Sequence, residues 1–234
     1  MKLQDIRASL RSSGNKEKAR VLRSFFKTGA GQYGEGDVFL GIAVPEIRKI
    51  ARRCQDISSY DIIQLLRSRI HEERMLALVL LLSRYGKATT NEKKIIYSLY
   101  LENIKHINSW DLVDVSAPHI VGDFLFKGNR SKLYCFARSK SLWERRTALV
   151  ATFRFIRAEQ FYDTIAIVKL LLKDEEDLIH KAAGWMLREV GKRNPRVHEQ
   201  FLKTYYKKMP RTMLRYAIEK LPQYTRQAYL RAKV

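Results

Sequence analysis

Trp110 and Asp114 are the residues of this chain whose types and spacing are best suited to chemistry. They stand four positions apart in a stretch of helical character, so their side chains lie on one face of a helix. A carboxylate can stabilise a nearby cation electrostatically, and the face of an indole attracts positive charge. One such cation is the oxocarbenium-like species that forms when a glycosidic bond breaks. The pair therefore has the chemistry needed to assist release of a base that already carries a positive charge.

An internal repeat runs through the segments that contain these residues. Residues 73–79 resemble residues 144–150, and steps of about 35 residues reach further segments of the same kind. The small or apolar residue at the centre of each segment marks the register: Ala77, Leu112, Ala148, Ala183 and Ala217. Such a period with two helices per unit is typical of an α-solenoid, whose stacked helices leave a concave surface. The sequence predicts an all-α solenoid that forms a single domain over residues 1–234.

The repeat register also places a set of polar side chains on one helix face. Two positions before each marker stand Met75, Trp110, Arg146, Lys181 and Arg215, and two positions after it stand Val79, Asp114, Val150, Trp185 and Glu219. A buried face would not carry so many charges without partners, so we expect this face to line a concave basic groove. In that groove Asp114 would lie between the two indoles of Trp110 and Trp185. The alternative is that both tryptophans are ordinary core aromatics.

The charge of the chain indicates a polyanionic partner. The 234 residues include 45 Lys and Arg against 24 Asp and Glu, which gives a net charge of +21. Nucleic acid is the commonest polyanion, and the alternative is a basic surface that is merely solvated. We assign contacts with nucleic-acid phosphates to the cations of the predicted groove and their neighbours: Arg145, Arg146, Lys181, Arg188 and Arg215.

Several classes of protein are disfavoured by composition and spacing. No run of 18 apolar residues exists, so we expect no transmembrane helix. Cys54 and Cys135 are too few for a disulfide framework, and they fit buried thiols in a reducing compartment. We expect no metal site, because the five histidines have no metal-ligand spacing: His71, His106, His119, His180 and His198.

Local signals mark several helix boundaries. Helical character begins at about Lys16, Pro45 opens a helix, Ser58 or Ser59 caps the next one, and Asn194 caps another before a proline. A Gly-x-Gly-x-x-Gly stretch lies within residues 28–38, but it follows an amphipathic helix and not a strand. We therefore interpret residues 28–38 as a Gly-rich loop and not as a dinucleotide site.

Five short motifs, taken in their order along the chain, resemble those of a known family. They are Phe39-Leu40-Gly41-Ile42-x-x-Pro45-Glu46-x-Arg48, Ser109-Trp110-Asp111-x-Val113-Asp114, Gly122-Asp123, Trp143-x-x-Arg146-x-Ala148 and Lys181-Ala182-x-Gly184-Trp185-x-Leu187-Arg188-Glu189. Together they resemble the AlkD-type DNA alkylation repair proteins, which are DNA glycosylases built from HEAT-like repeats. The resemblance covers roughly residues 15–220.

The resemblance implies that the concave face binds double-stranded DNA. It further implies base excision repair by hydrolytic release of cationic N3- or N7-alkylpurines, without metal or cofactor. By motif match, Asp114 would be the catalytic carboxylate, Trp110 and Trp185 would cradle the deoxyribose of the lesion, and Arg146 would contact a nearby phosphate. We expect a monomer that works on the nucleoid in the cytoplasm.

Two alternatives to a glycosylase stay open. The family also contains members that bind branched DNA and excise no base, so one alternative is a non-catalytic protein that binds branched or distorted DNA. The other is a scaffold for acidic proteins, a common use of solenoids. The indole and carboxylate face at Trp110 and Asp114 argues against the scaffold.

Overall fold

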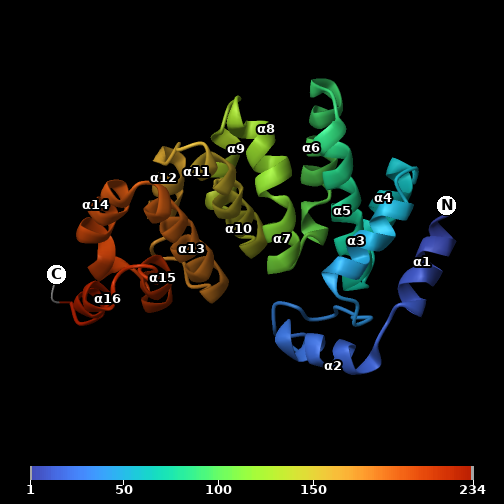
Figure 1. The fold of residues 1–234 in the computed structure, drawn as a ribbon, viewed down its shortest axis with the longest axis horizontal. Coiled ribbons are helices and arrows are strands. Elements are labelled where there is room, and N and C mark those ends of the chain that lie inside the picture. Colours follow the sequence, from blue (N-terminus) through green and yellow to red (C-terminus); the bar gives the residue numbers. More distant parts are fainter. Residues whose placement is uncertain (1, 233–234) are drawn as a thin grey trace. The chain divides into compact units, whose positions relative to one another are not determined.

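The computed structural model of the chain describes residues 2–232, and most of them are helical (Figure 1). No strand occurs in this range, where the isolated bridge pairs Val38 with Ile70. None of the described helices is long and apolar enough to cross a membrane. The chain divides into two compact units, residues 1–116 and residues 117–234.

The first unit is organised around helix α5. Its elements are α1 (Leu3–Ser12), α2 (Lys16–Phe25), α3 (Val44–Arg53), α4 (Ser59–Leu66), α5 (His71–Lys87), α6 (Thr90–Glu102), a 3-10 turn η1 (Ile104–His106) and α7 (Trp110–Ser116). In Figure 1, α5 lies between the pair α3 and α4 and the pair α6 and α7, and it packs against all four. Residues 75–78 of α5 are buried without interruption, as expected for a helix that is covered on every side.

The second unit is organised around helix α13. Its elements are a π-helical turn η2 (Pro118–Gly122), α8 (Asp123–Phe126), α9 (Ser131–Ala137), α10 (Leu142–Ala151), α11 (Phe153–Arg157), α12 (Tyr162–Leu170), α13 (Asp177–Arg193), α14 (Pro195–Tyr205), a 3-10 turn η3 (Tyr206–Lys208), α15 (Arg211–Ala217) and α16 (Gln223–Leu230). Helix α13 packs against α10, α12, α14 and α15. Its inward face carries small residues that let these neighbours approach closely.

The predicted helical repeat is confirmed. The five marker residues fall on α5, α7, α10, α13 and α15, and each is at most 1% exposed. Within a unit, helices with successive markers pack against each other: α5 on α7, α10 on α13, and α13 on α15. An all-α solenoid is therefore the correct fold class. The concave basic groove and the single domain over 1–234 stay predictions, and positions 1 and 233–234 of that range lie outside the described residues.

The helix boundaries follow the capping signals of the sequence. Helix α3 has Pro45 in its first turn, the hydroxyl of Ser58 accepts a hydrogen bond from the Asp61 amide at 3.0 Å, and Asn194 accepts one from Val197 at 3.1 Å. Helix α1 begins well before Lys16, the expected start of helical structure. It is held by its buried i, i+4 pair, Ile6 and Leu10, a signal that is present in the sequence.

The two cysteines differ in exposure. Cys54 is buried at the end of α3, whereas Cys135 is exposed, so the prediction of two buried thiols is wrong for Cys135. The reason is the face on which this residue lies. Helix α9 buries Leu133, Phe136 and Ala137, and Cys135 falls on its outward side.

The segment between α2 and α3 forms turns and no helix, as predicted for its glycine-rich part. Gly41 has a φ of +82°, and a Cβ there would lie 2.1 Å from the Asn15 carbonyl oxygen, so only glycine fits. The buried carboxylate of Glu72 accepts hydrogen bonds from the amides of Leu40 at 2.9 Å and Gly41 at 2.8 Å. The end of the loop is thereby fixed to the first turn of α5.

Gly184 sets the distance between α13 and α15. A Cβ at this position would lie 2.5 Å from both the Met213 carbonyl oxygen and the Tyr216 Cβ. We predict that Gly184→Ala lowers the free energy of unfolding by about 1–3 kcal/mol, because the two helices must move apart. Urea denaturation measures this change. Gly86→Ala is the matched control, since a Cβ there meets nothing within 4 Å, and it should leave stability unchanged or raise it.

Candidate functional site

Helix α7 presents Trp110 and Asp114 on the face that the sequence predicts. Both side chains are partly buried and stand one turn apart. Leu112 and Val113 are 0% exposed and face the core of the first unit. The core thus fixes the rotation of α7, and Trp110 and Asp114 are left at its boundary with solvent.

Trp110 is held by other aromatic rings. Its indole stacks on Phe26 with a centroid distance of 5.2 Å and an interplanar angle of 12°, and Phe25 meets it edge-on at 5.9 Å. Phe39 stacks on the other side of Phe26 at 5.0 Å. Each such pair contributes about 0.5–1.5 kcal/mol beyond burial. The indole therefore has one well-defined orientation while part of its surface stays accessible.

A cavity of about 680 Å³ lies beside this indole within the first unit. Its walls are mostly apolar and include Val21, Phe25 and Phe39, while Trp110 and Asp111 form part of its floor. A volume of this size is in the range of ligand-binding clefts. The site therefore has room for a bulky apolar group next to Trp110.

Both ends of α7 are tied to neighbouring helices by buried polar groups. At its start, Asp111 Oδ2 lies 2.8 Å from His71 Nε2 on α5. At its end, the Ser116 hydroxyl lies 3.0 Å from the Tyr100 hydroxyl on α6 and donates to the Leu112 carbonyl at 2.6 Å. These contacts fix α7 along its axis as well as about it.

His71 is the functional candidate that sequence reasoning missed. Its ring is 5% exposed and bridges Asp111 and Asp37, the latter at 3.3 Å. Burial lowers the pKa of His71, but hydrogen bonds with Asp111 and Asp37 outweigh that effect, so its pKa is raised. The available signal was the run His71-Glu72-Glu73-Arg74 at the start of an otherwise apolar helix, because buried charges require partners.

Trp185 lies on α13 in the second unit and is also partly buried. It packs against a cluster that contains Ile156, Met186 and Val190, and the Phe153 ring lies 5.8 Å from it. One side of the Trp185 indole thus packs in the core, as the interpretation of this residue as a core aromatic predicts, and the rest of the indole is accessible. Because Trp185 and Asp114 belong to different units, their approach to each other stays a prediction.

The structure places Arg146 in the interior of the second unit. Its side chain is only 4% exposed, and Nη1 donates to the Leu178 carbonyl. Charge therefore does not mark an exposed side chain at this position, where a carbonyl oxygen accepts a hydrogen bond from the guanidinium. Arg145 is held as well, with Nε 2.6 Å and Nη2 3.2 Å from the two carboxylate oxygens of Asp174.

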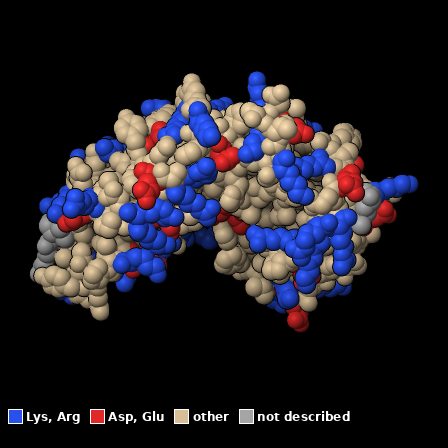
Figure 2. All heavy atoms as spheres, turned by 45° about the horizontal axis from the view of Figure 1, so that its top comes forward, with Lys and Arg blue, Asp and Glu red and all other residues tan. Residues whose placement is uncertain are grey.

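The remaining predicted phosphate contacts are more accessible. Arg215 on α15 is exposed, and Lys181 on α13 forms a surface ion pair of 2.7 Å with Asp177. Arg188 is less so, because its side chain is only 17% exposed and pairs with Glu219. Figure 2 shows Lys and Arg gathered in patches over each unit, with Asp and Glu scattered between them. The assignment of DNA contacts to all five cations stays a prediction.

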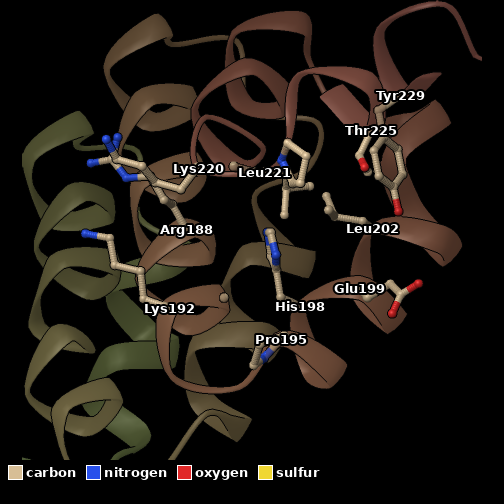
Figure 3. Close-up of a pocket in the computed structure, with 13 residues that line it drawn as sticks. Arg188, Lys192, Pro195, His198, Glu199, Leu202, Lys220, Leu221, Thr225 and Tyr229 are labelled. Carbon is tan, nitrogen blue, oxygen red and sulfur yellow. The ribbon is translucent and has the colours of Figure 1, made fainter. Parts of the chain in front are cut away.

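A second cavity, of about 410 Å³, lies in the second unit among α13, α14, α15 and α16 (Figure 3). His198 projects into its middle, and Arg188, Lys192 and Lys220 gather at one side. Within the described residues, His198 Nε2 has no hydrogen-bond partner. Burial lowers the pKa of His198 to about 4, so the ring is neutral at neutral pH. Nor does the described part of the chain contain a group of three His, Cys, Asp or Glu that could hold a metal ion.

His198 makes the stability of the fold dependent on acid. Its pKa in the folded chain, about 4, lies below the usual 6.5, so folding disfavours the protonated ring. The contribution of the neutral His198 ring to the free energy of unfolding is complete above pH 6.5 and is lost as the pH falls to about 4. We predict that His198→Gln removes about 3 kcal/mol of this pH dependence. Urea titrations of both proteins across that range measure the difference, and equal losses of stability would contradict the assignment.

Comparison with known proteins places this chain in a family. A family model described as DNA alkylation repair enzyme matches residues 6–221. None of the curated proteins matches the chain. A solved structure described as a predicted DNA alkylation repair enzyme from Enterococcus faecalis is 19% identical, covers 90% of this chain and 98% of its own, and superposes with a TM-score of 0.71. That likeness shows the same fold, and the family match over most of the sequence shows that the chain belongs to the DNA alkylation repair enzymes.

Proposed function

We propose that this chain is a DNA glycosylase that hydrolyses the N-glycosidic bond of cationic N3- and N7-alkylpurines in duplex DNA. Membership of the DNA alkylation repair enzymes gives it a role in alkylation repair, with DNA as its partner. The observation that carries the finer proposal is the pairing of Trp110 with Asp114 on one fixed turn of α7.

Asp114 carries the chemical step in this proposal. As the bond between deoxyribose and the alkylated base breaks, positive charge moves from the base onto the sugar ring. A carboxylate fixed beside that ring stabilises the charge and orients a water molecule for attack on the anomeric carbon. The alkylated purine leaves as a neutral base, so the site needs no general acid. Asp114 would therefore act without a metal or cofactor.

Trp110 supports the same charge from its π face. An indole face stabilises a nearby cation by about 0.5–2 kcal/mol, and the stacking of Phe26 on the indole keeps that face in place. A second indole, Trp185, would add to this on the other side of the sugar. The cations of the second unit would hold the DNA by its phosphates and leave the bases unread.

The first test is base release from duplex DNA that contains N7-methylguanine. We predict that the wild-type chain releases the base and that Asp114→Asn lowers the rate by about 100-fold or more, because the charge on the sugar loses its partner. Duplex binding should be unchanged in this variant. Asp61→Asn is the matched control, since Asp61 is a carboxylate of the same unit that bonds to Ser58 on α4, and its rate should equal that of the wild type.

The outcome of this test separates the candidate functions. Loss of binding in Asp114→Asn would make the carboxylate a structural group. Absence of base release from the wild type, with binding intact, would refute the glycosylase and favour the non-catalytic protein that binds branched DNA. Binding to four-way junctions would then be measured next.

The affinity for DNA should fall steeply with salt. Each neutralised phosphate contributes about −0.9 to the slope of log K against log salt concentration for duplex DNA. We predict that Arg215→Ala weakens binding and reduces the magnitude of this slope by about 1. Fluorescence anisotropy with a labelled duplex at several salt concentrations measures both quantities. Lys203→Ala on α14, where the amine already pairs with Glu199 at 2.7 Å, should leave the slope unchanged.

A further inference from the structure

His71 occupies a position in which both of its ring nitrogens face carboxylates. Nε2 lies 2.8 Å from Asp111 Oδ2, and Nδ1 lies 3.3 Å from Asp37 Oδ2. The ring stacks on Phe39 at 4.5 Å, and the Phe26 ring lies 5.0 Å from it at an interplanar angle of 42°. These uncharged faces exclude water, so the partners of the two nitrogens must come from the protein.

Hydrogen bonds to both carboxylates at once require a proton on each nitrogen. Ionised carboxylates only accept, so Nε2 can bond to Asp111 and Nδ1 to Asp37 only when His71 is an imidazolium. Charge balance agrees, since Asp37 also accepts from Arg74 Nη2 at 2.6 Å. Two carboxylates then face two cations, whereas a neutral ring would leave one buried negative charge in excess.

Asp111 depends on His71 for its compensation. Its other oxygen, Oδ1, is buried and has no hydrogen-bond partner among the described residues. Asp111 is also the residue between Trp110 and the buried Leu112, so its anchor fixes the first turn of α7. On the other side, Asp37 belongs to the loop that ends in Phe39, a member of the aromatic cluster around Trp110.

We propose that His71, as an imidazolium, is a positioning residue of the base-releasing site. It joins Asp37 of the Gly-rich loop to Asp111 of α7, and this link holds Trp110 and Asp114 in place. The proposal rests on the proposed function for its catalytic consequence only. His71 itself touches neither the substrate nor the reacting atoms. The charged groups that face it are Asp37 from the loop, Asp111 from α7 and Arg74 from its own helix.

Deprotonation breaks one of the two links. Arg74 Nη2 lies 3.4 Å from His71 Nδ1 and can donate to it once that nitrogen has lost its proton. The ring then keeps Asp111 and loses its bond to Asp37, which stays paired with Arg74, so the tie that runs through His71 from the loop to α7 is broken. The hydrogen bonds with Asp111 and Asp37 raise the pKa of His71 above 6.5, so the linkage is complete below pH 6.5 and is lost as the pH rises through the folded-state pKa.

Nuclear magnetic resonance tests the linkage without any assay of catalysis. The full chain is labelled with 5-fluorotryptophan and with ¹⁵N-histidine, and the fluorine signal of Trp110 is assigned by its loss in Trp110→Phe. We expect His71 to titrate with a midpoint above 6.5 and the Trp110 signal to follow the same midpoint. Asp111→Asn should lower both midpoints together, whereas Asp123→Asn, which removes a carboxylate paired with Arg154, should change neither.

The rate of base release gives the catalytic half of the test. Between pH 6.5 and the alkaline plateau, kcat should fall by about tenfold, the change expected when one charge-assisted hydrogen bond is lost, while KM stays constant. In Asp111→Asn this fall should move to lower pH with the midpoint of His71. His71→Gln bonds to one carboxylate and does not titrate, so its kcat should be low and independent of pH over the same range.

Each contrary result has its own meaning. A neutral His71 at pH 6.5 would overturn the proposal, and so would a Trp110 signal that does not change as His71 titrates. Both conclusions hold whether or not the chain releases bases. If His71→Gln fails to fold, the two midpoints of Asp111→Asn still decide the question. If the wild type releases no base but the two signals titrate together, the glycosylase proposal fails and the positioning of α7 by His71 stands.

Discussion

Four consecutive ionisable residues are buried in the first turn of α5, and the arrangement of the first unit depends on how they are compensated. His71, Glu72, Glu73 and Arg74 are each at most 4% exposed. A buried ion without a partner costs several kcal/mol, so each of these residues requires a specific neighbour. Their long-range partners come from three parts of the chain.

The compensation of these charges explains the shape of the site. Glu72 holds the backbone of residues 40–42, Glu73 pairs with Arg7 of α1 at 3.1 Å, and Arg74 and His71 together bind Asp37. His71 also reaches Asp111 of α7. One helix turn thus connects the N-terminal helix, the Gly-rich loop and the helix of Trp110 and Asp114. Neutralising Glu72 by mutation would release residues 40–42, and neutralising Glu73 would release α1.

The helical repeat could be predicted from the sequence, whereas the charge network around His71 could not, and the reason is physical. Ala77 and Ala183 are small, recur at a fixed period and are buried, so periodicity alone identifies the helices that stack. The bonds of His71 to Asp37 and Asp111 span 34 and 40 residues, and no local pattern specifies pairs at such separations. Arg146 shows the same limit, since its guanidinium lies in the core of the second unit and bonds to the Leu178 carbonyl of α13, 32 residues away.

A net charge of +21 favours DNA binding but opposes the reaction proposed for Asp114, because a cationic sugar is repelled by surrounding lysines and arginines. The first turn of α7 and its neighbours counter this locally. In the buried network, Asp37 and Asp111 are balanced by His71 and Arg74, so the network adds no net positive charge beside α7 while His71 is protonated. The buried charges of α5 therefore separate a region suited to a developing cation from the basic surface that attracts the DNA.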